Sequence, residues 1–188
     1  MSVVVAVKKN NKTVVCTDSQ VNFGNMAIDG ANYQSTKAWR WGGNIICRTG
    51  WEKYHLILKN YLDKQEMREL TSATEVADLF YLFWEHCKDE HGFVNYQSGN
   101  TNSPWLNMDS DFMWVNKNGI WLISSDLSVS EYDHFHATGS GRDWALGALS
   151  ALHPKKNESA SQIAKQAVKV ACTYNVYCGG QIKTLTVR

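Results

Sequence analysis

The chain has 188 residues, of which 44% are hydrophobic, with only two prolines and a formal net charge of +1. This composition excludes a disordered chain, and the charge balance gives no electrostatic basis for binding nucleic acid or an anionic membrane. No apolar run reaches the roughly 18 residues that a membrane-spanning helix needs. We expect a single domain over residues 1–188.

The cysteines indicate the compartment. There are five, an odd number, and their spacing fits no zinc motif. The apolar run at residues 3–7 is too short for a secretory signal, and its two lysines follow the run instead of preceding it. We therefore expect reduced, mostly buried thiols in a cytoplasmic protein, with no metal site.

The first half of the chain begins with strand patterns. Residues 3–7 form a β-branched run without polar alternation, which predicts a strand covered on both faces, and residues 13–17 return after a polar turn. Residues 23–36 are polar and predict a loop or a short irregular hairpin. Residues 37–41 and 44–48 predict two strands joined by a Gly-Gly turn.

Two helices are expected next. The first begins after Gly50, with one apolar face made by Trp51, Tyr54, Leu58, Tyr61 and Leu62. The second begins at a capping box, Ser72-x-x-Glu75. Residues 91–108 are polar and predict a long loop.

The second half repeats the order of strands followed by helices. Residues 112–115 and 120–124 flank an Asn-Lys-Asn-Gly turn and predict a hairpin. An apolar helix follows Gly141, and another begins at the capping box Ser159-x-x-Gln162. A final strand is expected at residues 182–187. Grouped strands and grouped helices favour an α+β fold, a four-layer αββα sandwich with two stacked sheets and a helix pair outside each.

Ser2 is the first candidate catalytic residue. If Met1 is removed, one residue carries both a hydroxyl nucleophile and an α-amine that can act as its base. This is the logic of an N-terminal nucleophile hydrolase. Many proteins begin Met-Ser without using the serine in catalysis, so evidence for a catalytic Ser2 has to come from the remainder of the chain.

Four segments in chain order resemble the proteasome β-type family, and the bacterial HslV peptidases most closely. Residues 16–20, Cys-Thr-Asp-Ser-Gln, end the opening strand pair, and the spacing from Ser2 to Asp18 matches the family without a gap. Residues 25–37 resemble the segment leading to the active-site Lys. Residues 45–50 resemble the strand before the oxyanion-hole glycine, and residues 136–141 the Gly-Ser-Gly connection to a helix.

The resemblance implies roles for these residues. Ser2 would attack the peptide carbonyl, and its α-amine would take the proton. Lys37 would place a positive charge beside Ser2, and Asp18 would keep Lys37 charged. The N–H of Gly50 would donate to the oxyanion, and Ser140 would orient the Ser2 amine.

Other readings of the same residues stay open. Asp18 and Lys37 can form an ordinary surface ion pair, Gly50 can simply end a strand, and Ser140 can cap a helix. Some residues also depart from the family pattern. Ser2 stands where most members have Thr, while Asn175 and Cys178 occupy the places of a supporting Asp and Ser. By resemblance to HslV, a monovalent cation would bind near Cys172, Asn175 and Cys178; no other cofactor is expected.

The resemblance also implies substrates and partners. Gln20 and Arg48 would contact substrate, and Arg48 would form the floor of the pocket for the side chain before the cleaved bond, favouring acidic or polar residues. Alternatively, Arg48 pairs with an acidic residue of a neighbouring subunit. The expected enzyme is an endopeptidase for peptides or unfolded proteins, assembled as a homo-oligomeric ring or double ring and served by an ATPase unfoldase. An inert assembly protein and an amidase for small amides are the alternatives.

Overall fold

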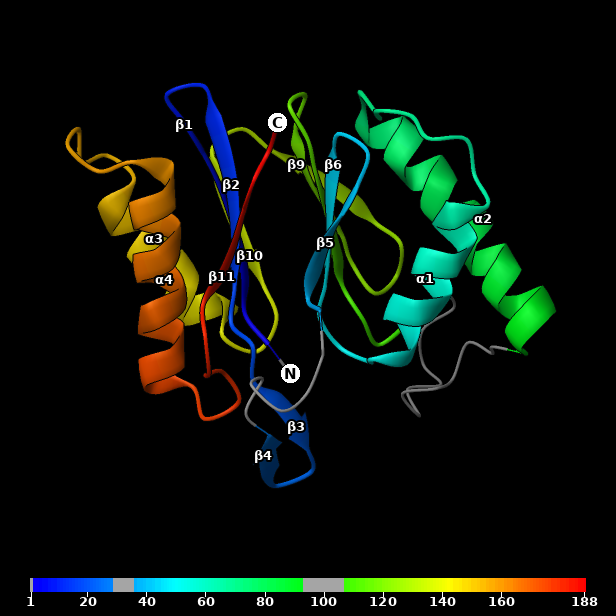
Figure 1. Ribbon diagram of the computed structural model, residues 1–188, viewed down its shortest axis with the longest axis horizontal. Helices are drawn as coiled ribbons and strands as arrows, with labels where there is room; N and C mark the ends of the chain where they lie inside the picture. Colours follow the sequence, from blue (N-terminus) through cyan, green and yellow to red (C-terminus); the bar gives the residue numbers. More distant parts are fainter. Residues whose placement is uncertain (1, 29–35, 93–106) are drawn as a thin grey trace.

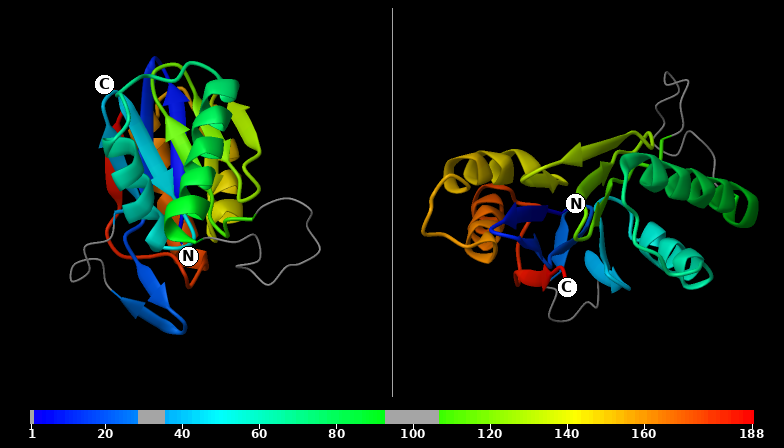
Figure 2. Two further views of the ribbon diagram at one scale, coloured as in Figure 1. Left: turned by 90° about the vertical axis from the view of Figure 1, so that its right-hand side faces the viewer. Right: turned by 90° about the horizontal axis from the view of Figure 1, so that it is seen from above.

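A computed structural model describes residues 2–28, 36–92 and 107–188. Its elements form four layers, helix pair, sheet, sheet and helix pair (Figure 1). The view from above in Figure 2 shows the helix pairs on opposite outer sides of the two sheets. The predicted αββα sandwich is confirmed.

The first sheet has the strand order β10-β1-β2-β11. It contains β1 (Val4–Lys9), β2 (Lys12–Thr17), β10 (Phe135–Thr138) and β11 (Lys183–Thr186), and the adjacent strands are antiparallel. The turn between β1 and β2 uses Asn10 and Asn11, which both have positive φ, at 51° and 58°. These values suit the tight turn of a two-residue hairpin.

The second sheet has the order β5-β6-β7-β8-β9. Its strands are β5 (Ala38–Trp41), β6 (Asn44–Arg48), β7 (Phe112–Val115), β8 (Ile120–Ile123) and β9 (Val129–Tyr132), again antiparallel. A separate hairpin of β3 (Val21–Phe23) and β4 (Met26–Ile28) projects from the end of the sandwich (Figure 1). Its second strand lies in the segment 23–36 predicted as a loop or an irregular hairpin, but its first strand begins two residues before that segment.

Strand β1 shows why its sequence lacks alternation. Val3, Val5 and Val7 pack in one core with the helices α3 (Arg142–Leu152) and α4 (Ala160–Tyr174). The intervening Val4 and Ala6 pack in a second core against the other sheet. Because helices cover one face and a sheet the other, both sets of side chains are apolar.

The opposite helix pair comprises α1 (Lys53–Asp63) and α2 (Ala73–His91), packed on the second sheet around a core rich in aromatic rings. The prediction for α1 was wrong at Trp51. This residue precedes the helix and is 59% exposed, whereas Tyr54, Leu58, Tyr61 and Leu62 are buried as expected. The predicted loop at residues 91–108 lies mostly outside the described residues.

The two predicted caps behave differently. Ser159 and Gln162 form the full capping box of α4. At α2, the hydroxyl of Ser72 accepts the N–H of Glu75, but the Glu75 carboxylate accepts from the backbone and hydroxyl of Thr71 instead of closing the box on Ser72.

Candidate active site

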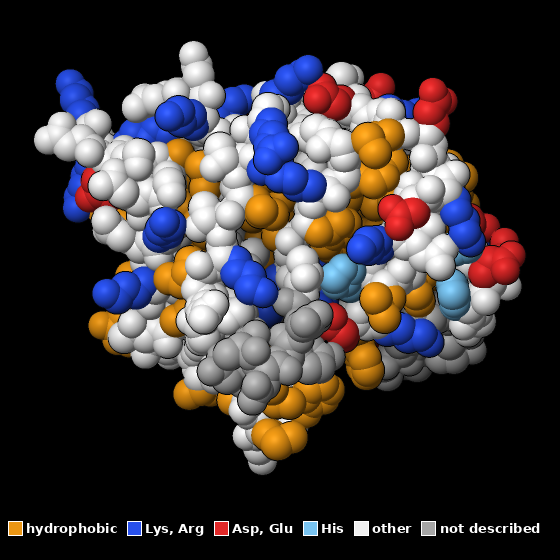
Figure 3. Space-filling view, viewed as in Figure 1, with side chains coloured by type: hydrophobic (Ala, Val, Ile, Leu, Met, Phe, Trp, Pro, Cys, Tyr) orange, Lys and Arg blue, Asp and Glu red, His pale blue; other side chains and the backbone are white. Residues whose placement is uncertain are grey.

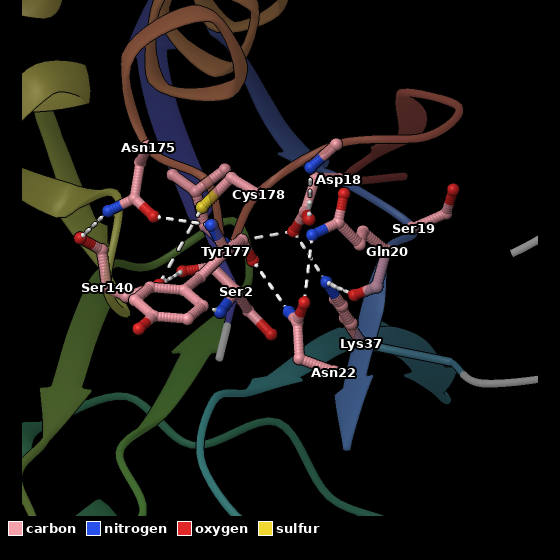
Figure 4. A network of polar contacts seen from close by, with 12 residues as sticks. Ser2, Asp18, Ser19, Gln20, Asn22, Lys37, Ser140, Asn175, Tyr177 and Cys178 are labelled. Carbon is pink, nitrogen blue, oxygen red and sulfur yellow. Dashed lines mark hydrogen bonds and ion pairs between the residues drawn. The ribbon is translucent and has the colours of Figure 1, made fainter. Parts of the chain in front are cut away.

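A cavity of about 480 Å³ lies at the end of the sandwich where the chain begins. Five residues singled out in the sequence line it: Ser2, Gln20, Lys37, Arg48 and Gly50. Four others, Asp18, Ser140, Asn175 and Cys178, form hydrogen bonds in the adjoining polar network (Figure 4). The fold therefore brings together residues up to 176 positions apart in the sequence, counting from Ser2 to Cys178.

Ser2 is held by the Gly-Ser-Gly connection between β10 and α3. Its backbone N–H donates to the hydroxyl of Ser140 at 3.3 Å, and that hydroxyl in turn donates to the Ser2 carbonyl at 3.3 Å. Gly139 has φ of +94°, and a Cβ at this position would lie 2.2 Å from the Ser2 carbonyl oxygen. Only glycine permits this approach.

Ser140 is not a helix cap. The cap position of α3 is Gly141, and no side chain bonds there. The Ser140 side chain is instead committed to Ser2, and its carbonyl accepts from the Asn175 amide at 2.6 Å. The Cys178 sulfur lies 3.8 Å from the Ser140 hydroxyl. Burial raises the pKa of Cys178 to about 11, so its thiol is neutral near pH 7.

Asp18 is the centre of the buried charges. It is fully buried, and its Oδ1 accepts from Lys37 Nζ at 2.6 Å and from the N–H of Val3 at 2.9 Å. Its Oδ2 accepts the N–H of Gly179 at 3.0 Å (Figure 4). The ion pair with Lys37 is therefore an interior one, not the solvated surface pair that the sequence left open.

Lys37 is also fixed at its head group. Besides Asp18, its Nζ donates to the carbonyl of Gln20 at 2.6 Å. Burial lowers the pKa of Lys37 from its ordinary value, and the Asp18 carboxylate opposes this effect. Since Lys37 lines the same cavity as Ser2, its charge acts in the space where a nucleophile would be activated.

Gly50 lines the cavity, and its backbone N–H is the candidate oxyanion donor. Its φ is +93°, and a Cβ would lie 2.4 Å from both the Asp109 carbonyl and the Ser110 hydroxyl. The neighbouring N–H groups are engaged: Thr49 donates to Asp111, and Trp51 donates to Ser110. Within the described part of the chain, the Gly50 N–H has no such acceptor. It is therefore suited to bind an oxyanion.

Sequence reasoning named Gln20 but missed its contacts, and it missed Asn22 and two residues of the cavity lining. The amide of Gln20 donates to the Val176 carbonyl at 2.9 Å, and that of Asn22 donates to the Tyr177 carbonyl at 3.0 Å. These bonds join the projecting hairpin to the turn after α4. Two further residues, Glu52 and Asp109, line the cavity. Arg48 ends strand β6 and Glu52 precedes α1, so their spacing of four residues, which pairs side chains only on a helix, gave no signal of their ion pair.

The same turn bears on the expected monovalent cation. The carbonyl of Asn175 accepts the N–H of Cys178 at 3.0 Å, which leaves one lone pair for another partner. The carbonyls of Val176 and Tyr177 each accept one of the amides described above and likewise keep one lone pair. Across residues 2–28, 36–92 and 107–188, there is no group of three His, Cys, Asp or Glu side chains that could hold a metal ion.

Comparisons with known proteins agree with this geometry. No protein-family model matches the chain. The subunit HslV of an ATP-dependent protease from Petrotoga mobilis is 26% identical over 95% of this chain and 93% of its own length. HslV of Treponema denticola is 28% identical, over 96% and 93%. The chain is HslV-like.

Solved structures share the fold of this HslV-like chain. Thiobacillus denitrificans BPH, solved in complex with epoxomicin, superposes with a TM-score of 0.88 at 21% identity, covering 98% of this chain and 97% of BPH. HslV from Trypanosoma brucei gives a TM-score of 0.68 at 16% identity, with 98% of each chain covered. The resemblance drawn from the four segments is thus confirmed over nearly the full chain. No helix in the described ranges is long and apolar enough to cross a membrane.

Proposed function

We propose that this HslV-like chain is an endopeptidase subunit in which Ser2, exposed by removal of Met1, is the nucleophile. The observation that supports this most is the placement of Ser2 and the Lys37–Asp18 pair at one cavity, with Ser140 on the Ser2 nitrogen.

The reaction would begin with attack of the Ser2 hydroxyl on a peptide carbonyl. Its proton passes to the Ser2 α-amine, whose ordinary pKa of about 8 suits a general base. Lys37 stabilises the negative charge on the attacking oxygen, and the Gly50 N–H donates to the oxyanion of the tetrahedral intermediate. The C–N bond then breaks, the leaving amine takes the proton from the α-amine, and an ester on Ser2 remains. Water, deprotonated by the same amine, hydrolyses this ester.

The remaining residues would support this centre. Asp18 maintains the charge of Lys37, and Ser140 orients the amine, with Asn175 and Cys178 behind it. Arg48 would line the pocket for the residue before the cleaved bond. Gln20 would position the start of β3 for substrate, since its carbonyl accepts from Lys37 and its amide donates to Val176.

The assembly proposed for this chain is a homo-oligomeric ring that receives unfolded protein from an ATPase. The relatives named as subunits of an ATP-dependent protease support this, and favour a peptidase over an amidase for small amides or an inert assembly protein. The cytoplasmic location and the monovalent cation near Cys172, Asn175 and Cys178 stay predictions.

Activity measurements on variants of Ser2 test the proposal. The purified protein should cleave fluorogenic peptides, Ser2→Ala should lose at least about 10³-fold in rate, and Ser2→Thr should retain activity because it supplies the same hydroxyl. Light scattering should give the mass of a closed ring. Equal rates for wild type and Ser2→Ala would overturn the proposal.

A further inference from the structure

The cavity that holds Ser2 also contains an ion pair within one chain. Arg48, the last residue of β6, donates from Nη2 to Oε2 of Glu52. The Arg48 side chain is 3% exposed, whereas that of Glu52 is 36% exposed, and both residues line the cavity. Glu52 is therefore the solvent-facing partner, placed where a substrate side chain would approach the guanidinium.

The Glu52 carboxylate has no capping role in its own helix. Glu52 is the cap residue of α1, yet its backbone is helical, with φ −60° and ψ −35°, and its side chain makes no capping hydrogen bond. Its second oxygen, Oε1, lies 3.8 Å from Nδ1 of His55, a ring that stacks on Trp39 at a centroid distance of 4.6 Å. Both oxygens thus face defined partners, so the carboxylate is oriented toward Arg48.

The charges of the cavity lining do not favour an acidic ligand. Asp18 offsets the charge of Lys37, and Glu52 offsets that of Arg48. Asp109, another acidic residue, also lines the cavity. An incoming acidic side chain would have to displace Glu52 from Arg48 and lie beside its negative charge. By competing for Arg48, Glu52 would disfavour substrates with an acidic side chain through charge, without any steric clash.

We propose that Glu52 is a specificity-determining residue: it occupies the Arg48 guanidinium and thereby excludes acidic side chains from the pocket for the residue before the cleaved bond. This inference rests on the proposed peptidase function. It reverses the acidic preference that Arg48 alone implies, and it assigns the pocket to uncharged side chains.

Matched peptides that differ only in the residue before the cleaved bond test this. Gln and Glu have nearly the same shape and differ in charge, so their ratio of kcat/KM reports the charge selectivity of the pocket. Wild type should prefer Gln over Glu. Glu52→Gln keeps the size of the side chain and removes its charge, and it should raise the Glu-to-Gln ratio by about tenfold or more.

Two further variants locate the effect. Adding Arg48→Gln to Glu52→Gln should abolish the increase in the Glu-to-Gln ratio of kcat/KM, because the guanidinium is then absent. Glu85→Gln is the control: Glu85 is also 36% exposed and pairs with Lys88 at 3.0 Å, but it lies on α2 and is not part of the cavity lining. Its ratio should equal that of wild type.

The outcomes separate this inference from the function on which it rests. Cleavage after Glu faster than after Gln by wild type overturns the role of Glu52, and this reading does not depend on any variant folding. An unchanged ratio in a folded Glu52→Gln protein that still cleaves the Gln peptide does the same, leaving the peptidase intact. Absence of any cleavage, together with failure of a β-lactone to label Ser2, would overturn both.

Discussion

The Oδ1 atom of Asp18 accepts a hydrogen bond from Lys37 Nζ at 2.6 Å, with both side chains buried. The same oxygen accepts the N–H of Val3, the residue after Ser2, at 2.9 Å. One carboxylate therefore maintains the charge of Lys37 and also fixes the start of the strand that carries Ser2. In the proposed mechanism, the activation of Ser2 and its position depend on the same group.

Asp18→Asn should alter the pH dependence of activity. Asn removes the negative charge, so the pKa of Lys37, already lowered by burial, falls further. A lysine is charged below its pKa and neutral above it, so the variant should lose the Lys37 charge at lower pH than wild type. We expect the deficit relative to wild type to grow as pH rises across the range in which both proteins stay folded, reaching about tenfold or more. A ratio of rates that stays constant across this range would contradict the role given to Asp18.

Gly139→Ala should disturb Ser2 more than a typical glycine substitution. A Cβ at residue 139 would lie 2.2 Å from the Ser2 carbonyl oxygen, on a backbone with φ of +94°. We expect a loss of stability of about 1–3 kcal/mol and a loss of peptide cleavage, measured by denaturant unfolding and by kcat/KM.

Gly147→Ala is the matched control for that substitution. Gly147 lies within α3, its Cβ would meet nothing within 4 Å, and alanine favours a helix more than glycine does. This variant should be as stable as wild type or more so, with unchanged activity. Equal effects of the two substitutions would show that the contact between Gly139 and Ser2 is unimportant.

His136 should make stability fall in mild acid. Its ring stacks on Tyr132 with a centroid distance of 3.9 Å, and burial lowers its pKa to about 4, with Asp111 opposing and Arg142 adding to the effect. The unfolded chain binds this proton near pH 6.5, so stability is fully present above that pH and declines as pH falls toward 4. Allowing for its partial exposure, the contribution lost between pH 7 and pH 5 is about 1 kcal/mol.

Unfolding in denaturant at the two pH values, at one protein concentration, measures this loss. Between pH 7 and pH 5, His136→Gln should lose less free energy of unfolding than wild type does. His91→Gln, at an exposed position at the end of α2, should lose as much as wild type. An identical loss in His136→Gln and wild type would remove His136 as the cause.

Local patterns predicted most of the fold because they report burial and chain geometry directly. The unbroken apolar run at residues 3–7 required cover on both faces, and the structure supplies helices on one side and a sheet on the other. The prediction for Trp51 was wrong because spacing alone does not show where a helix begins. Its spacing fits the apolar face of α1, but the helix begins only at Lys53, so the Trp51 ring is exposed. Where a helix begins depends on tertiary contacts as well as periodicity.

The site was predictable as a set of residues but not as a set of contacts. The sequence pointed to Asp18 and Lys37 through a family resemblance, yet only the fold shows that the pair is buried and that Asp18 also holds Val3. The bonds of Gln20 and Asn22 to the turn after α4 join residues more than 150 positions apart, which no local pattern encodes. The ion pair of Arg48 with Glu52 was also missed, because it joins the end of a strand to the residue before a helix, where no periodicity applies.

The central claim is that Ser2, freed of Met1, is the nucleophile, and intact mass spectrometry tests it most directly. The purified protein, measured before and after treatment with a β-lactone, should lack Met1 and gain one covalent adduct per chain. Ser2→Ala should also lack Met1 but gain no adduct. A wild-type protein that has lost Met1 and still takes up no β-lactone would contradict the account.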